Sequence, residues 1–184
     1  VYIVEGDSAL GSCKLARNPE FQAIMPIRGK ILNCLKADLP KIFKSDIILD
    51  LVKVLGCGIE ISSKHNKNVE TFSLENLRWD KVIICTDADV DGFQIRTLVL
   101  TMIYRLMPTL IEEGKVYIAE SPLYEIGILK TKRKGEKHFA YTDAEKDKIV
   151  AKLVEDGLSK ERDEYEIKRS KGLGENQPEM MSLT

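Results

Sequence analysis

The sequence predicts an α/β fold in which helices flank a mostly parallel sheet, with a small α+β appendage near the C-terminal end. Continuous apolar runs at residues 1–4 and 81–86 are typical of strands that are covered on both faces. A helical periodicity follows the second run, and this alternation of strands and helices favours a parallel sheet. After residue 126 the pattern changes to a hairpin, one helix and a last strand, which indicates the appendage.

The first half of the chain contains two predicted strands and two predicted helices. Pro19 stops the first helix, because a proline disfavours the helical conformation of the residue before it. Pro40 suits the first turn of the second helix, and Gly56 supplies a left-handed cap at its end. In order, the predicted elements are a strand at 1–4, a short helix at 9–17, a strand at 22–27 and a helix at 40–56.

The second half begins with the polar stretch 62–76, which is typical of a surface connection. Apolar residues from Ile95 to Leu106 then recur at the spacing of one helical face. Thr142 and Glu145 form a capping box, which marks the start of a later helix. The predicted elements are a strand at 81–86, a helix that ends near Pro108, a strand at 116–119, a hairpin at 126–141, a helix at 142–155 and a strand at 164–169.

Composition and charge narrow the class of protein. The 184 residues carry a net charge of −1, so the overall charge does not indicate a nucleic-acid binder. Charge is uneven, with five basic residues and one acidic in 128–137, and nine acidic and five basic in 143–166. No apolar run approaches the ~20 residues that span a bilayer, so we expect no membrane partner. The four cysteines form no C-x-x-C pair, which disfavours zinc and fits reduced thiols in a cytoplasmic protein.

Four carboxylates are predicted to gather at one edge of the sheet. Glu5 lies at the carboxyl end of one buried strand, and Asp87 at the carboxyl end of another. Ligand sites of open α/β sheets lie outside those strand ends, so the two acids are expected to be neighbours. Asp89 and Asp91 follow on alternate positions of the same turn. Carboxylates packed together resist ionisation, and a divalent cation such as Mg²⁺ removes that penalty.

Three other interpretations of the acidic motif at 87–92 fit less well. An EF-hand loop needs a glutamate at its twelfth position, which here is Leu98, and a helix where this chain has a predicted strand. A phosphatase with an aspartate nucleophile leaves Glu5 and the glycine-lysine motif at 171–175 unexplained. A solvated acidic turn accounts neither for the third aspartate with Gly92 nor for the distant Glu-Gly-Asp-Ser turn.

Four motifs occur in the order of one known family. They are Glu5-Gly6-Asp7-Ser8-Ala9, Arg28-Gly29-Lys30-Ile31-Leu32-Asn33, Thr86-Asp87-Ala88-Asp89-Val90-Asp91-Gly92 with Ile95-Arg96-Thr97, and Lys171-Gly172-Leu173-Gly174-Glu175. Together they resemble the Toprim region of the B subunit of bacterial type IIA topoisomerases, namely DNA gyrase and topoisomerase IV. The similarity covers nearly the whole chain and is weakest at 62–76 and 127–163. It implies the Rossmann-like Toprim fold.

The resemblance implies roles for the four carboxylates. Positions matching Glu5 and Asp87 bind the catalytic metal in the family, and positions matching Asp87 and Asp89 bind a second metal. Asp91 matches a position that supports the site more variably. The expected cofactor is Mg²⁺, with Mn²⁺ or Ca²⁺ as substitutes.

The same resemblance implies contacts with DNA. Lys30 and Asn33 match positions that contact DNA, and the basic stretch that carries them makes Arg28 a further expected contact. The Lys171 motif lies close to the cleavage site in the family, so Lys171 is also expected to contact DNA. Asp7 and Arg28 match the region where quinolone drugs act.

The implied enzyme is an ATP-dependent type II DNA topoisomerase that cleaves and religates double-stranded DNA with Mg²⁺. The family takes its catalytic tyrosine from the A subunit, so an A2B2 assembly is expected and the isolated chain should be inactive. This sequence contains no Walker-type loop. ATP binding is therefore assigned to an amino-terminal domain outside it. The motifs do not separate gyrase from topoisomerase IV, because the distinguishing wrapping domain belongs to the other subunit.

These features divide the chain into three predicted parts. Residues 1–126 form the Toprim core, 127–163 a hairpin-helix insertion, and 164–184 a return strand with the lysine-glycine motif and the start of a truncated tail. Since residues 1–4 are typical of the middle of a strand, we expect the chain to be a piece of a larger protein.

Two other functions share part of the evidence. Another Toprim enzyme, a primase or a nuclease, has Glu5 and the aspartates but not the Lys30 and Lys171 motifs. A non-catalytic scaffold has the fold without metal binding. The chain also departs from the family at Leu10, Gln94 and Ser170, where a small residue, a histidine and a tyrosine are usual. None of these departures removes a predicted metal ligand.

Overall fold

The computed structural model describes residues 1–61, 69–169 and 173 of the chain. Its centre is a four-stranded sheet of order β2-β1-β3-β4 in which all neighbouring strands are parallel. This arrangement confirms the predicted α/β class. The strands are β1 (Tyr2–Glu5), β2 (Ile24–Ile27), β3 (Val82–Cys85) and β4 (Val116–Ala119).

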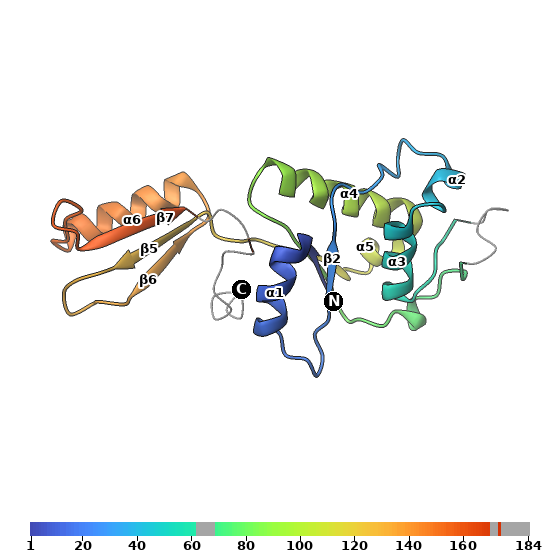
Figure 1. Cartoon of the computed structure of the whole chain (residues 1–184), viewed down its shortest axis with the longest axis horizontal. Helices are drawn as coiled ribbons and strands as arrows, with labels where there is room; N and C mark the ends of the chain where they lie inside the picture. The colour runs from blue at the N-terminus through green and yellow to red at the C-terminus, as the bar shows by residue number, and fades with distance from the viewer. Residues whose placement is uncertain (62–68, 170–172, 174–184) are drawn as a thin grey trace.

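Helices cover both faces of this sheet (Figure 1). The largest apolar cluster lies on one face, where Leu51 and Leu55 of α3 and Met102 of α4 pack beside Ile3 and Ile84. The opposite face has a smaller cluster, in which Ala9 and Cys13 of α1 pack beside Val4 and Cys85. The helices are α1 (Gly6–Ala16), α2 (Leu39–Ile42), α3 (Asp46–Leu55), a 3-10 turn at Leu74–Asn76, α4 (Val90–Leu106) and α5 (Thr109–Glu112).

The prediction of one helix over residues 40–56 was wrong, because the chain forms two helices there. Asp38 accepts a hydrogen bond from the backbone N–H of Lys41 and caps α2. Ser45 then takes an extended conformation and begins α3 as a separate helix. The end of α3 is as predicted, since Gly56 is left-handed with a φ of 79°. Helix α1 also begins earlier than predicted, directly after Glu5.

Residues 124–169 form a second, antiparallel sheet of order β6-β5-β7, which lies with α6 at one end of the molecule (Figure 1). Its own core contains Ile126, Leu153 and Tyr165. The predicted capping box is confirmed, since the Thr142 side chain accepts from the N–H of Glu145. The elements are β5 (Tyr124–Ile128), β6 (Lys137–Ala140), α6 (Asp143–Glu155) and β7 (Tyr165–Arg169).

None of the helices among residues 1–61 and 69–169 has both the length and the apolar composition needed to cross a bilayer. The four cysteines are free and buried. Burial raises the pKa of the Cys85 thiol to about 12, so this residue behaves as a small apolar side chain at neutral pH.

Candidate functional site

The predicted proximity of Glu5 and Asp87 is confirmed by the register of the sheet. Strands β1 and β3 are parallel neighbours with Val4 opposite Cys85, so their carboxyl ends meet at one edge. The backbone N–H of Asp87 donates a hydrogen bond of 3.2 Å to Oε2 of Glu5. Gly6, directly after Glu5, has a φ of 71°, a conformation that favours glycine and turns the chain from β1 into α1.

The acidic turn is folded tightly against the start of α4. Asp89 is the N-cap of this helix, and its Oδ1 accepts a hydrogen bond of 2.8 Å from the backbone N–H of Gly92. A Cβ atom on Gly92 would lie only 2.1 Å from the carbonyl oxygen of Asp87. The glycine that follows the three aspartates is therefore required for the close contact between the end of β3 and the start of α4.

Each of the four carboxylates contacts a donor from the protein. Glu5 accepts from Asp87, and Oδ1 of Asp87 accepts a hydrogen bond of 2.7 Å from the backbone N–H of Leu173. Asp89 caps α4, and Oδ1 of Asp91 lies 2.8 Å from Nζ of Lys30. Within the described ranges, no three Asp, Glu, His or Cys side chains converge closely enough to hold a metal ion together.

The carboxylates nevertheless act on one another electrostatically. Burial raises the pKa of Glu5 above its ordinary value, and the charges of Asp87, Asp89 and Asp91 add to the rise, while the hydrogen bond from Asp87 opposes it. A divalent cation among them would remove this repulsion. Carboxylate oxygens are the ligands that Mg²⁺ prefers, so the donor set fits such an ion. The hydrogen bond of Asp89 and the ion pair of Asp91 each use only Oδ1, and a carboxylate that accepts one hydrogen bond can still bind a cation.

The basic residues after β2 lie beside the two acidic turns. Nε of Arg28 is 3.1 and 3.0 Å from the two carboxylate oxygens of Asp7, which ties this segment to the start of α1. Lys30 makes the ion pair with Asp91 at the start of α4. Arg28 and Lys30 are both well exposed. The structure thus brings four of the predicted site residues into two ion pairs at the edge of the sheet.

Asn33 has a role in the shape of its own loop. Its side-chain oxygen accepts hydrogen bonds from the backbone N–H groups of Leu35 and Lys36. Arg105 of α4 fixes the same loop, because its Nη1 donates to the carbonyl oxygen of Ala37 at 2.7 Å and also to that of Cys34. Arg105 was not predicted from the sequence, because it belongs to a helix that was identified by its apolar face.

Two further polar residues near the acidic turn belong to the third motif but were assigned no role of their own from the sequence. Thr86, directly before Asp87, is 2 % exposed, and its hydroxyl has no hydrogen-bond partner in the described part of the chain. The same holds for Nε of Arg96 on α4. Buried polar atoms without partners each cost about 1–3 kcal/mol and are uncommon in folded proteins.

The predicted DNA contact Lys171 and three other motif residues (172, 174 and 175) lie outside the described residues, as does Ser170. Leu173 is described, and it lies against the carboxylate cluster. This places part of the motif at 171–175 beside the motifs that contain Glu5 and Asp87.

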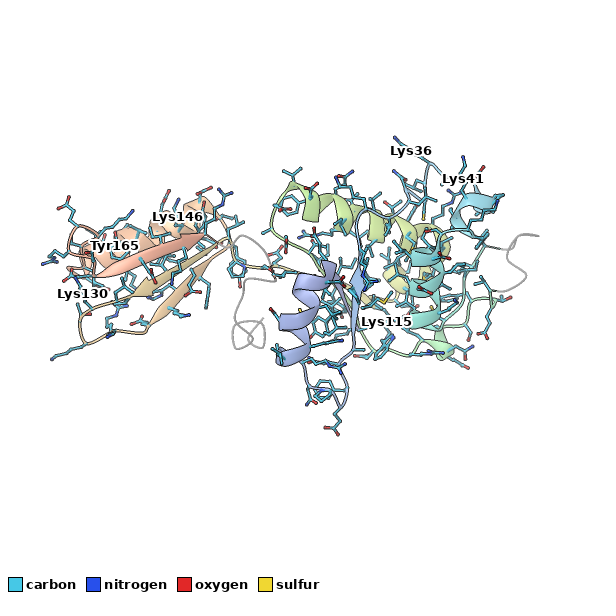
Figure 2. All side chains as sticks on the ribbon, viewed as in Figure 1. Lys36, Lys41, Lys115, Lys130, Lys146 and Tyr165 are labelled. Atoms are coloured by element: carbon cyan, nitrogen blue, oxygen red, sulfur yellow. The ribbon has the colours of Figure 1, made fainter. Side chains whose placement is uncertain are left out.

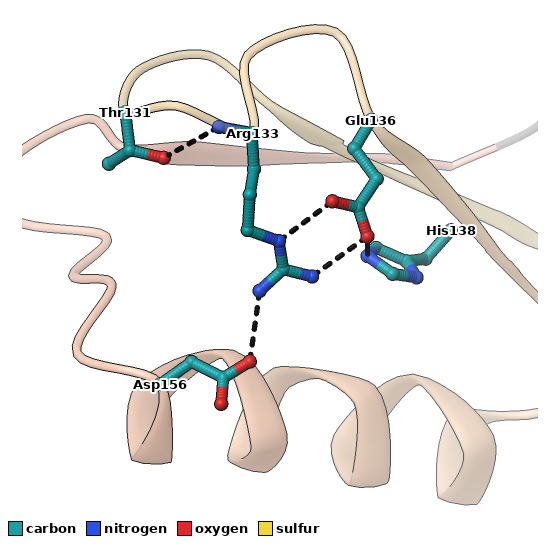
Figure 3. Close-up of polar contacts among 5 residues, drawn as sticks. All are labelled: Thr131, Arg133, Glu136, His138 and Asp156. Atoms are coloured by element: carbon teal, nitrogen blue, oxygen red, sulfur yellow. Dashed lines mark hydrogen bonds and ion pairs between the residues drawn. The ribbon is translucent and has the colours of Figure 1, made fainter.

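The basic stretch 128–137 is partly neutralised within the appendage. The guanidinium of Arg133 donates to both carboxylate oxygens of Glu136, at 2.7 and 2.8 Å, and to Asp156 of the loop after α6 at 2.9 Å (Figure 3).

Lys36 and Lys41 lie near α2, whereas Lys130 lies at the other end of the molecule (Figure 2). The basic side chains labelled there are therefore distributed over both ends of the molecule.

Two substitutions at Asp89 separate its capping role from a metal-binding role. We expect Asp89→Ala to lower the free energy of unfolding by about 1 kcal/mol, because the helix loses its N-cap. Asp89→Asn should retain that stability, since asparagine is an equally good cap. Both variants should bind Mn²⁺ more weakly than the wild type. Urea denaturation and Mn²⁺ titration measure the two effects, and an asparagine variant with unchanged Mn²⁺ affinity would count against Asp89 as a ligand.

Comparison with known proteins gives one matching family and a set of similar chains. The model of the Toprim domain matches residues 1–121. The chain is 46% identical to the DNA gyrase B subunit of Spiroplasma citri and 45% identical to that of Thermotoga maritima, in each case over 98% of this chain and 25% of the relative. It is 49% identical to the type 2 topoisomerase B subunit of Aquifex aeolicus over 78% of this chain and 16% of that protein. The chain thus spans about a quarter of the length of the gyrase relatives.

Proposed function

The chain belongs to the Toprim domain family, and from this premise we propose that it is the metal-binding segment of an ATP-dependent type II DNA topoisomerase, within the B subunit. The observation that carries the proposal is the meeting of Glu5 and Asp87 at adjacent strand ends, with Asp89 and Asp91 on the next turn. The gyrase relatives support the enzyme class. The proposed place of action is the cytoplasm.

Glu5, Asp87 and Asp89 are the proposed metal ligands, and Asp91 supports them. Mg²⁺, when bound, neutralises charge on the scissile phosphate and on the leaving 3′ oxygen of the DNA. The protein contributes a fixed geometry, since Asp87 is held through its N–H by Glu5 and through its carboxylate by Leu173. Mn²⁺ or Ca²⁺ is expected to bind to the same carboxylate oxygens.

The nucleophilic tyrosine is proposed to come from an A subunit in an A2B2 assembly. Three of the six tyrosines have evident local roles. The hydroxyl of Tyr2 accepts from Gln22, that of Tyr124 donates to Asp143, and Tyr165 is buried in the core of the appendage. ATP turnover is assigned to a different domain of the full-length protein. The isolated chain is therefore expected not to cleave DNA.

Lys30 is proposed to bind a DNA phosphate after it leaves Asp91. The pair is exposed, so its disruption costs only about 0–1 kcal/mol and does not prevent the exchange. We expect Lys30→Gln to weaken DNA binding at all sequences and to reduce the slope of log K against log salt by about 1. Lys53→Gln is the control, because Lys53 pairs with Asp50 on α3 in a similarly exposed position. Equal slopes for the two variants would remove Lys30 from the interface.

The test of the proposed function uses a full-length B subunit that contains this chain, together with its A subunit. DNA cleavage should require Mg²⁺, cease when EDTA is added and return when Mg²⁺ or Mn²⁺ is in excess. Each of the two proteins alone should leave the DNA intact. Introduction of negative supercoils identifies gyrase, whereas decatenation without supercoiling identifies topoisomerase IV. Cleavage that persists in EDTA, or cleavage without the A subunit, would contradict the proposal.

A further inference from the structure

Leu173 is buried against the strands that carry the candidate metal ligands. Leu173 is 1% exposed and belongs to the apolar cluster on the α1 face of the parallel sheet. That cluster also contains Val4, which precedes Glu5, and Cys85, two residues before Asp87. Ala9 and Cys13 of α1 complete it. The side chain of Leu173 is therefore fixed by the same two strands that bring Glu5 and Asp87 together.

The backbone of Leu173 reaches the carboxylate of Asp87. Its N–H donates a hydrogen bond of 2.7 Å to Oδ1 of Asp87, across 86 positions of sequence. A hydrogen bond to a carboxylate at this distance is strong. The backbone of Asp87 is also fixed, by its N–H bond to Glu5 and by the close approach of Gly92 to its carbonyl oxygen. With the backbone held, the bond from Leu173 contributes to the orientation of the side chain.

We propose that Leu173 is a positioning residue for Asp87: its buried side chain anchors a backbone N–H that holds one carboxylate oxygen and orients the other toward the cation. This inference rests on the proposed function, because it takes Asp87 as a metal ligand. Groups that hydrogen-bond to metal ligands fix the ligand's orientation, and their loss costs about 10–100-fold in metal affinity. In this role Leu173 acts on the cation through Asp87.

The donor in this hydrogen bond is a backbone N–H, so the side chain of Leu173 affects the bond only by holding that backbone in place. Leu173→Ala removes the anchor and leaves the N–H, which is then no longer held in place. Leu173→Met keeps nearly the same apolar volume and should keep the anchor. We expect the alanine variant to bind Mn²⁺ about 10–100-fold more weakly and the methionine variant to bind within a few-fold of the wild type.

The matched control is Leu153→Ala. Leu153 is 2% exposed in the separate core of the appendage, so the same atoms are lost from an equally buried site. A purely structural effect would lower the thermal midpoint in both alanine variants and leave the Mn²⁺ affinity of each folded protein unchanged. The positioning role instead predicts weaker Mn²⁺ binding for Leu173→Ala alone. Calorimetric titration of folded protein, with thermal unfolding measured in parallel, gives both quantities.

An ester in place of the amide at position 173 provides a second test that keeps the leucine side chain. Introducing the α-hydroxy analogue of leucine removes only the N–H donor, and we expect the same loss of Mn²⁺ affinity. This variant decides the question if Leu173→Ala does not fold. Wild-type affinity in the ester variant, or equal weakening in Leu153→Ala, would overturn the positioning role. A wild-type chain that binds no Mn²⁺ through Asp87 would contradict the proposed function itself.

Discussion

Gly92→Ala is expected to weaken cation binding by about 10–100-fold, the usual cost when the groups that orient metal ligands are disturbed. The added Cβ would lie 2.1 Å from the carbonyl oxygen of Asp87 and 2.9 Å from its nitrogen. These are backbone atoms at the end of β3, so no side-chain rotation relieves the overlap. The start of α4, which carries Asp89 and Asp91, must therefore move away from Asp87.

The stability of the same variant should fall by about 1–3 kcal/mol, which is the usual cost of overpacking. Gly11→Ala is the matched control, since Gly11 lies within α1 and has no heavy atom within 4 Å of the added Cβ. Its effect should be neutral or stabilising by about 0.5–1 kcal/mol. Urea denaturation and Mn²⁺ titration of both variants give the comparison. If Gly92→Ala matched Gly11→Ala in both measurements, the close contact would not be important for the site.

Asp87→Asn is expected to abolish cation-dependent DNA cleavage in the assembled enzyme, with a loss of at least about 100-fold. Asparagine keeps the side-chain oxygen that accepts from Leu173, so the variant should fold with the turn in place. It removes one negative charge from the neighbourhood of Glu5, whose pKa is raised by burial and by these carboxylates. Without a divalent cation, the variant should therefore be at least as stable as the wild type.

Asp50→Asn is the control for that substitution, because Asp50 is an exposed carboxylate on α3 that pairs with Lys53. It should leave both cleavage and the response of the thermal midpoint to Mg²⁺ unchanged. The wild type should gain stability as Mg²⁺ is added, whereas Asp87→Asn should not. Full cleavage activity in Asp87→Asn would exclude Asp87 as an essential metal ligand.

The parallel sheet was predictable because its strands are short, continuous apolar runs. Ile3 and Ile84 face the larger cluster while Val4 and Cys85 face the smaller one, so both strands are buried on both faces. The position of Glu5 and Asp87 followed from the rule that ligand sites lie at the carboxyl ends of parallel strands. That rule needs only the strand assignment, and it was sufficient to place residues 82 positions apart beside each other.

Contacts made by single residues were not predictable in the same way. Arg105 lies on a helix that was identified by its apolar stripe, and nothing in its spacing indicates the loop carbonyls that it binds. The anchor formed by Leu173 depends on a backbone N–H, a group that every residue except proline carries. The break between α2 and α3 was missed because Pro40 and Gly56 suit the two ends of one helix as well as those of two.

The distribution of charge also depends on the folded structure. The basic stretch 128–137 has a marked excess of positive charge in the sequence, but the fold places Asp156 against Arg133, and Lys137 pairs with Glu125 of β5. Since the partners are distant in sequence, a local charge count does not reveal the pairing. At the candidate site, the ion pairs Arg28–Asp7 and Lys30–Asp91 likewise join residues that are distant in sequence.

The metal site is tested most directly by titrating the chain with Mn²⁺ and following the loss of the free-ion electron paramagnetic resonance signal. We predict binding that Mg²⁺ displaces, that is abolished by Asp87→Asn and strongly weakened by Glu5→Gln, and that is unchanged by Asp50→Asn. DNA and the A subunit are added if the chain alone binds weakly, because a phosphate completes the oxygen ligands. Absence of carboxylate-dependent binding even in that assembly, or equal binding by wild type and Asp87→Asn, would contradict the metal site.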